Sequence, residues 1–174
     1  MTTLPNDVGS PGTRCLPSAG WIRCGRFLGL LVASTLTAMA GRDWPEFRGP
    51  TGQGLSSARD VPVGWNVTSN VVWKAAIPGE GWSSPVRVGS RIYLTTATPS
   101  PSGGLDLQAL AVDAETGRTV WVTSVFREES AKASGIHRKN SNASPTPVVS
   151  GRRLYVHFGH LGTACLDLDG AVRW

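Results

Sequence analysis

The densest cluster of polar side chains in the chain is His137-Arg138-Lys139-Asn140-Ser141-Asn142. Imidazole, ammonium and amide groups this close together can hydrogen-bond to an anionic or polysaccharide-like ligand. We therefore predict that His137, Lys139 and Asn140 contribute to a ligand-binding surface. The competing interpretation is a solvated loop in which the Asn and Ser side chains cap turns.

Other residue types that catalyse reactions or bind metals are sparse. The chain has three histidines, and His157 and His160 show no spacing that is typical of a metal site. Asp113 and Asp167 stand in turn sequences, which accounts for both carboxylates without catalysis. We predict no catalytic, cofactor-binding or metal-binding residue in this sequence.

Residues 1–40 are typical of a leader that ends in a secretory signal peptide. Arg23 and Arg26 precede a short apolar run, and small residues close that run, so we expect cleavage after Ala40. The run is short for a membrane span, which makes a membrane anchor the less favoured alternative. The sequence predicts an exported protein, periplasmic or at the cell surface, with no stable membrane span after cleavage.

The cysteine and charge content indicate which kinds of partner and cross-link the protein has. Cys15 and Cys24 fall in the leader, and the alternation of Cys165 with Leu166 predicts a buried, inert thiol. The formal net charge is +5, but three of the 17 basic residues precede Gly41, and the later arginines stand beside turns. Because nucleic-acid binding needs a clustered basic face, we predict no nucleic-acid partner.

The elements that must position these residues are repeats, because one pattern occurs twice. Ser84-Pro-Val-x-x-Gly-x-Arg-Ile-Tyr-Leu94 returns as Thr146-Pro-Val-x-x-Gly-x-Arg-Leu-Tyr-Val156. A second element, Asp113-Ala-Glu-Thr-Gly-Arg-Thr-Val-Trp121, is echoed by Asp167-Leu-Asp-Gly-Ala-Val-Arg-Trp174. With 21 Gly, 12 Pro and 17% charged residues, the composition indicates turn-rich β-structure. Repeats of this size need neighbours to bury their apolar faces.

Alternation and turn residues divide the mature sequence into segments. Residues 41–70 predict an extended N-terminal strap, anchored by Trp44, Phe47 and Trp65. The sequence of residues 71–77 predicts a strand. The sequence of residues 127–142 predicts a polar insertion with a helical turn at 128–133. The strands expected in the repeats are 86–88, 91–97, 107–113 and 118–125, followed by 148–149, 153–158, 163–167 and 171–174.

The Ser-Pro-Val strand followed by Asp-x-x-Thr-Gly-x-x-x-Trp resembles the blade repeat of the pyrroloquinoline-quinone-like β-propellers. These include quinoprotein alcohol dehydrogenases and an outer-membrane assembly scaffold. The segment Asp43-Trp-Pro-Glu-Phe-Arg-Gly-Pro50 extends the resemblance to exported propellers of planctomycete-type bacteria. The resemblance covers most of residues 43–174. It implies an all-β fold, namely a partial β-propeller.

The partial propeller would comprise about two four-stranded blades, at 84–125 and 146–174, and a closing strand at 71–77. In the resembled family such a strand completes the last blade of an eight-bladed ring. Two blades alone would leave apolar faces and a sheet edge in water. We therefore interpret the chain as the N-terminal fragment of a longer protein. Assembly of several copies into a ring is the alternative.

Turn chemistry explains why the second repeated element recurs. Asp113 can accept backbone N–H bonds, and Gly117 can take a positive φ that excludes other residues. The resemblance implies that the tryptophan after each such turn docks neighbouring blades by burying its ring and donating its indole N–H. The structural residues predicted in this way are Trp73, Trp121, Trp174, Asp113, Gly117, Asp167 and Gly170.

Loops on rigid blades can form a binding surface, and this is the basis of the functional prediction. We predict a non-enzymatic scaffold or binding platform with a protein or cell-envelope polysaccharide as partner. In a propeller, residues 137–142 precede the innermost strand of a blade and face the axial channel. The alternative is a pyrroloquinoline-quinone-dependent oxidoreductase, whose quinone, Ca²⁺ ligands and carboxylate base would be encoded outside this sequence. Fold alone does not decide between the two.

Overall fold

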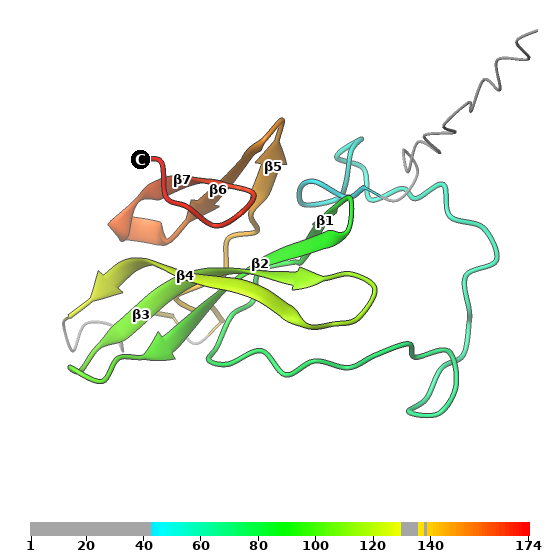
Figure 1. Cartoon of the computed structure of the whole chain (residues 1–174), viewed down its shortest axis with the longest axis horizontal. Helices are drawn as coiled ribbons and strands as arrows, with labels where there is room; N and C mark the ends of the chain where they lie inside the picture. The colour runs from blue at the N-terminus through cyan, green and yellow to red at the C-terminus, as the bar shows by residue number, and fades with distance from the viewer. Residues whose placement is uncertain (1–42, 130–135, 138) are drawn as a thin grey trace, which may run out of the picture. The chain divides into compact units, whose positions relative to one another are not determined.

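The computed structural model of the chain describes residues 43–129, 136–137 and 139–174 (Figure 1). These residues all belong to one compact unit, Thr37–Trp174. The predicted leader and signal peptide lie outside the described residues, as does most of the helical turn expected at 128–133. None of the described residues forms a helix with the length and apolar character that crossing a membrane requires.

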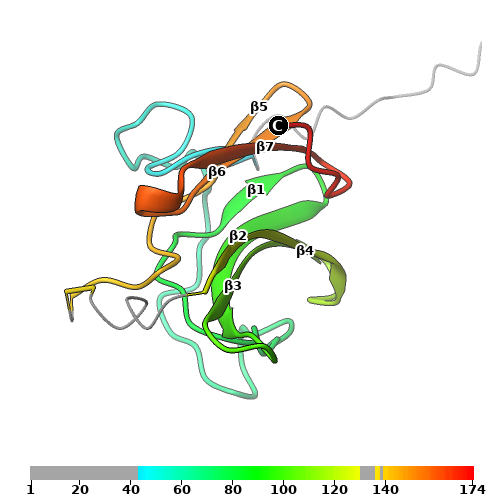
Figure 2. The ribbon, with the colours of Figure 1, turned by 90° about the vertical axis from the view of Figure 1, so that its left-hand side faces the viewer.

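The chain folds into two consecutive antiparallel sheets, which Figure 2 shows as two separate layers. The first has the order β1-β2-β3-β4 and the second the order β5-β6-β7. A short 3-10 helix, η2 (Gly159–Leu161), connects β6 to β7. The strands are β1 (Val86–Val88), β2 (Arg91–Pro99), β3 (Leu105–Asp113), β4 (Thr119–Glu128), β5 (Val148–Ser150), β6 (Arg153–His157) and β7 (Thr163–Asp167). The all-β prediction is confirmed, and two meandering sheets in succession fit part of a β-propeller.

The two sheets repeat each other residue by residue, so we call them blade 1 and blade 2. In blade 1, Tyr93 pairs with Ala111, and Ala111 with Trp121. In blade 2, Tyr155 pairs with Cys165, whose N–H donates to the carbonyl of Trp174 at 2.8 Å. The sequence repeat is therefore also a repeat of strand register.

Glycine sets the tight turns that keep this register. Gly89 and Gly151 begin the two-residue connections β1–β2 and β5–β6, at φ of 59° and 58°. This conformation costs glycine little and other residues much more, and it matches the twist of the flanking strands.

The core lies between the two blades. Blade 1 contributes buried alternating residues such as Tyr93 and Ala109, and blade 2 contributes Leu154, Val156 and Leu166. Cys165 is 1% exposed and forms no disulfide, as predicted. Since each sheet presents an apolar face to the other, the hydrophobic effect holds the blades together.

Two predicted strands differ from expectation. Residues 71–77 are not assigned as a strand and form no ladder with any described strand, although Trp73, Ala75 and Ile77 lie beside Ile92 and Leu94 of β2. Residues 171–174 lie beside β7 through the bridge Leu166↔Val172 and backbone hydrogen bonds to Cys165 and Asp167, but they are not assigned as a strand. Blade 2 is therefore three-stranded, with its fourth strand marked by one bridge.

The polar insertion also begins later than predicted. Strand β4 continues through Glu128, because Phe126 pairs with Leu107 and Arg127 with Asp106. The guanidinium of Arg127 lies 3.0 Å from the Asp106 carboxylate, which supports this extension. Glu128 is consequently a strand residue and not the start of a helical turn.

The strap is anchored at its beginning. Trp44 forms an antiparallel bridge with Arg87 of β1, and the carbonyl of Pro45 accepts the N–H of Val149 in β5 at 2.8 Å. Phe47 and Trp65 are 60% and 71% exposed, so the expectation that they also anchor the strap is wrong. The start of the strap thus joins the first strands of both blades, and we call residues 43–45 the clasp.

Candidate functional site

Trp121 of blade 1 contacts the turn that follows β7 in blade 2. Its indole N–H donates to the carbonyl of Leu168 at 3.1 Å. Its ring lies over Gly170, where a Cβ atom would come within 2.7 Å of ring carbon Cδ2. Gly170 has a φ of 93°, so the glycine supplies both the backbone conformation and the space for the ring.

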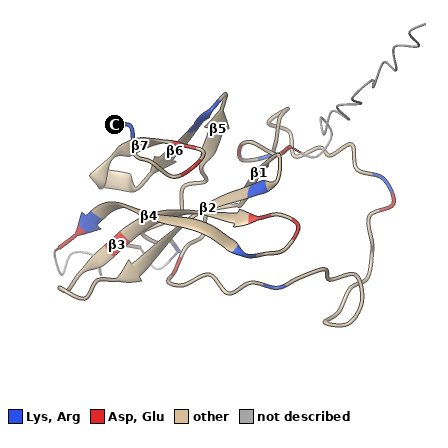
Figure 3. Cartoon of the chain, in the orientation of Figure 1, with Lys and Arg blue, Asp and Glu red and all other residues tan. Residues whose placement is uncertain are grey.

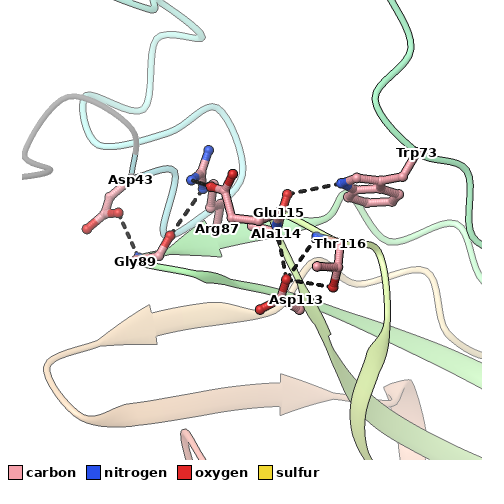
Figure 4. Close-up of polar contacts among 8 residues, drawn as sticks. All are labelled: Asp43, Trp73, Arg87, Gly89, Asp113, Ala114, Glu115 and Thr116. Carbon is pink, nitrogen blue, oxygen red and sulfur yellow. Dashed lines mark hydrogen bonds and ion pairs between the residues drawn. The ribbon is translucent and has the colours of Figure 1, made fainter.

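Trp73 makes the same contact with the equivalent turn of blade 1. Its indole N–H donates to the carbonyl of Ala114 at 3.1 Å (Figure 4). A Cβ atom on Gly117 would lie 2.5 Å from its ring carbon Cε3. Residues 71–77 therefore occupy, relative to blade 1, the place that β4 occupies relative to blade 2. This equivalence holds although the segment pairs with no strand.

The receiving turns are built by their aspartates. Asp113 Oδ1 accepts the backbone N–H of Thr116 at 2.9 Å and its hydroxyl at 2.8 Å (Figure 4). These hydrogen bonds from Thr116 hold the pKa of Asp113 below its usual value. In blade 2, the N–H of Ala171 donates to Asp167 Oδ1 at 2.8 Å and is the main reason why the pKa of Asp167 is lowered.

Tyrosines support the tryptophans within each blade. The rings of Tyr93 and Trp121 are 6.1 Å apart, and those of Tyr155 and Trp174 are 6.2 Å apart. Burial raises the pKa of Tyr93. Trp174 is 67% exposed, so it does not reach a receiving turn among the described residues.

This arrangement of a tryptophan over the turn of the next blade can be compared with known families. The family model described as outer membrane protein assembly factor BamB matches residues 55–174. The chain belongs to this BamB family. A comparison with curated proteins found no match.

The docking contacts of this BamB-family chain lie on one side of the blades. We call this the turn side, since it carries Gly89 and the turns after Asp113 and Asp167. The opposite side, the loop side, carries the β2–β3 connection, the residues after β4, and η2. The Lys, Arg, Asp and Glu residues of the described part lie mainly at strand ends and in turns (Figure 3).

The predicted ligand-binding residues lie on the loop side and are exposed. The N–H of Lys139 donates to His137 Nδ1 at 3.2 Å, and the N–H of Ser141 donates to Asn140 Oδ1 at 3.1 Å. His137 and Asn140 thus take part in local turns, as the competing interpretation expected, and their outer faces stay in contact with solvent. Their role in ligand binding stays a prediction.

A cavity of about 130 Å³ lies beside these residues, between the two blades. Its lining combines Leu107 of β3 and Asn140 with residues of the β6–β7 connection, including Phe158 and His160. Of the three predicted residues, only Asn140 lines it; His137 and Lys139 do not.

Sequence reasoning missed the pair His160 and Glu128 at this cavity. His160 Nε2 lies 2.9 Å from Glu128 Oε2, and the Glu128 side chain is 10% exposed. The two residues are far apart in the sequence and belong to different blades, so no local pattern could indicate the contact. The pair joins the blades on the loop side, as Trp121 joins them on the turn side.

A calcium-dependent quinone site requires several oxygen ligands close together. In the ranges that the structure describes, no group of three or more His, Cys, Asp or Glu residues is arranged to share a metal ion. Asp113 and Asp167 direct their oxygens to their own turns. The described residues therefore do not provide the ligand set that this cofactor requires.

Proposed function

We propose that this chain is part of an exported, non-enzymatic β-propeller scaffold in the periplasm or at the cell surface. The BamB family description, an outer membrane protein assembly factor, supports a scaffold or assembly-factor type. It also favours a protein partner in the cell envelope over a polysaccharide. The signal peptide predicted at residues 1–40 is consistent with this location.

The observation that supports the proposal most strongly is that docking contacts and exposed polar side chains lie on opposite sides of the blades. On the turn side, Trp73, Trp121, Asp113 and Asp167 are engaged in docking and turn contacts. On the loop side, exposed polar side chains stand on a framework that those contacts hold rigid. Rigid blades with variable loops are a common basis for protein recognition.

The end of the insertion is fixed to blade 1 by several hydrogen bonds. The carbonyl of Ala143 accepts the N–H groups of Trp82 and Ser83, each at 3.1 Å, and the hydroxyl of Thr95 at 3.4 Å. Ala143 itself is fully buried. Lys139 and Asn140 therefore project from a segment with a firmly held base, which reduces the entropy that a partner must overcome on binding.

Site-specific photo-crosslinking in cells tests the proposal. A photoreactive residue at Lys139, on the loop side, should crosslink to an outer-membrane protein or to the machinery that assembles it. The same residue at Thr51, exposed in the strap, serves as the matched control and should not give that product. Equal crosslinking from both positions would overturn the assignment of the loop side.

The non-enzymatic part of the proposal has its own test. Addition of pyrroloquinoline quinone and Ca²⁺ to the purified protein should change neither its absorbance nor its dye-linked oxidation of alcohols and sugars. A quinone-dependent increase in dye reduction would contradict a scaffold and would favour the oxidoreductase alternative.

A further inference from the structure

We propose that residues 61–72 of the strap contact the surface of a lipid bilayer and insert their apolar side chains among the headgroups. We call these residues the strap tip. Such a contact lies at the membrane surface and does not span the bilayer. It involves none of the residues on the loop side, so it goes beyond the proposed scaffold function, and either can fail without the other.

The strap tip exposes its apolar side chains almost completely. Val63, Val67 and Val72 are 98%, 89% and 91% exposed, and Trp65 is 71% exposed. Apolar residues occupy every second position from Val61 to Val67, which is the pattern of a strand with one buried face. In the structure these side chains lie in water instead. Apolar groups gathered in this way on a surface mark a contact with a partner or with a membrane.

The distribution of charge around the strap tip suits a bilayer. None of residues 61–72 is charged, and Figure 3 shows this part of the strap in tan. The nearest charged residues in the sequence are Arg59 and Asp60 before the tip and Lys74 after it. An apolar centre with basic residues at its edges matches the apolar interior of a bilayer beneath polar, often anionic, headgroups.

The polar groups of the strap tip bond to one another. The backbones of Asn66 and Ser69 exchange two hydrogen bonds, at 3.0 and 3.1 Å, across a two-residue turn. Asn66 Oδ1 accepts the N–H and the hydroxyl of Thr68, each at 2.9 Å. The Asn70 amide donates to the carbonyl of Gly64 at 2.8 Å. Because polar groups that already have partners cost less to transfer out of water than free ones, this turn can enter the headgroup region.

The shape of the strap tip favours a bilayer over a protein partner. A specific protein interface buries about 1,000 Å² or more over a broad surface. A two-residue turn with Trp65 beside it is too narrow to supply such an area by itself. A bilayer accepts a narrow apolar projection without a matching groove. Tryptophan favours the headgroup region, since its ring is apolar and its indole N–H is polar.

The rest of the protein holds the strap on both sides of the tip. The clasp, residues 43–45, joins the start of the strap to β1 and β5. Directly after the tip, Trp73 donates to the carbonyl of Ala114 in the turn of blade 1. Insertion of the tip would therefore attach blade 1 to the membrane surface through a short connection.

An environment-sensitive fluorescent residue tests whether the tip meets lipid. At Val67 of the full chain, its emission should move to shorter wavelength when vesicles of phosphatidylcholine and phosphatidylglycerol are added. At Thr51, exposed in the strap but outside the tip, it serves as the matched control and should not shift. Since the signal is specific to position, vesicle binding by the predicted signal peptide would not by itself produce it. No shift at Val67, or equal shifts at both positions, overturns the inference.

Titration of the Val67 signal with vesicles measures what the aromatic ring contributes. Trp65→Ser should weaken binding by about tenfold, because the variant no longer buries the ring in lipid. Phe47→Ser is the matched control and should leave binding unchanged, since Phe47 is also aromatic, 60% exposed and in the strap but outside the tip. Thermal unfolding shows that both variants are folded.

Vesicles of phosphatidylcholine alone separate insertion from attraction between charges. They should still bind the chain, though more weakly than vesicles with phosphatidylglycerol. Binding that requires phosphatidylglycerol and is the same in a folded Trp65→Ser protein would arise from the net positive charge of the chain, and it overturns the inference. The crosslinking result at Lys139 is independent of all these outcomes.

Discussion

Trp121 lies over Gly170 of the next blade, and its indole N–H donates to the carbonyl of Leu168 at 3.1 Å. Trp73 stands in the same relationship to Gly117 and Ala114. The two contacts use the same atoms at corresponding positions of consecutive repeats. Both contacts join neighbouring units on the turn side.

Two substitutions of Trp121 should separate the contribution of the indole hydrogen bond to the free energy of unfolding from the contribution of the ring. Trp121→Phe leaves the Leu168 carbonyl without its donor and should lower the free energy of unfolding by about 1 kcal/mol. Trp121→Ala also removes the ring and should cost about 3 kcal/mol. Urea unfolding measures both. Trp65→Ala, at a residue 71% exposed, is the control and should cost less than about 0.5 kcal/mol.

Gly170→Ala should destabilise the chain more than Gly103→Ala. The two glycines have nearly the same φ, 93° and 90°, so the backbone strain is matched at about 1 kcal/mol. A Cβ on Gly103 meets nothing within 4 Å, whereas on Gly170 it meets the Trp121 ring. The extra cost at Gly170 should be about 1–3 kcal/mol. Equal thermal shifts for the two variants would show that the ring contact contributes nothing.

Acid should destabilise the receiving turns. The pKa values of Asp113 and Asp167 are lowered in the folded state by hydrogen bonds to their ionised forms. The stability that these groups contribute is therefore complete above their unfolded pKa and is lost as the pH falls through the folded values. The melting temperature should be flat near neutrality and fall below about pH 4.

The double variant Asp113→Asn and Asp167→Asn isolates this contribution. Asparagine can still accept a turn hydrogen bond but does not ionise in this range. Its melting temperature at neutral pH should be lower than that of the parent, and its decline on acidification should be shallower. If the melting temperature of the double variant fell as steeply on acidification as that of the parent, other carboxylates would be responsible for the acid sensitivity.

The clasp should protect the backbone amide of Val149 from hydrogen exchange. The N–H of Val149 is protected by Pro45, outside the strand ladders. The bridge between Trp44 and Arg87 is made by backbone groups, which an alanine keeps, whereas the Trp44 ring packs on Gly49 and is lost in the variant. Trp44→Ala should therefore accelerate exchange at Val149 while amides within the β6–β7 ladder keep their protection. Faster exchange at Val149 and in that ladder together would indicate general unfolding.

Much of the fold could be predicted because it depends on local patterns. Strand alternation gave β1 and β7 with their observed bounds, and the glycine spacing indicated the turns. The end of β4 escaped prediction because the ladder shifts register between Leu107 and Gln108, which breaks the alternation before Phe126. Residues 71–77 have the pattern of a strand, yet a strand also needs a neighbour, which no local pattern provides.

The candidate site was less predictable, since contacts between distant residues form it. The cluster at residues 137–142 indicated the loop side, and Asn140 does line the cavity. His160 and Glu128 carry no recognisable spacing, and the clasp depends on backbone groups that every residue possesses. Only the folded arrangement of two blades brings these groups together.

The pairing of tryptophan and turn bears on how such chains grow in evolution. Each repeat carries a receiving turn and, a few residues later, the tryptophan that fits the turn of the next copy. Duplication of one repeat therefore produces a new interface whose two halves already match, without any compensating substitution. A substitution in one turn, by contrast, damages a single interface and leaves the others intact. We therefore expect blade number to change more readily than the residues that join the blades.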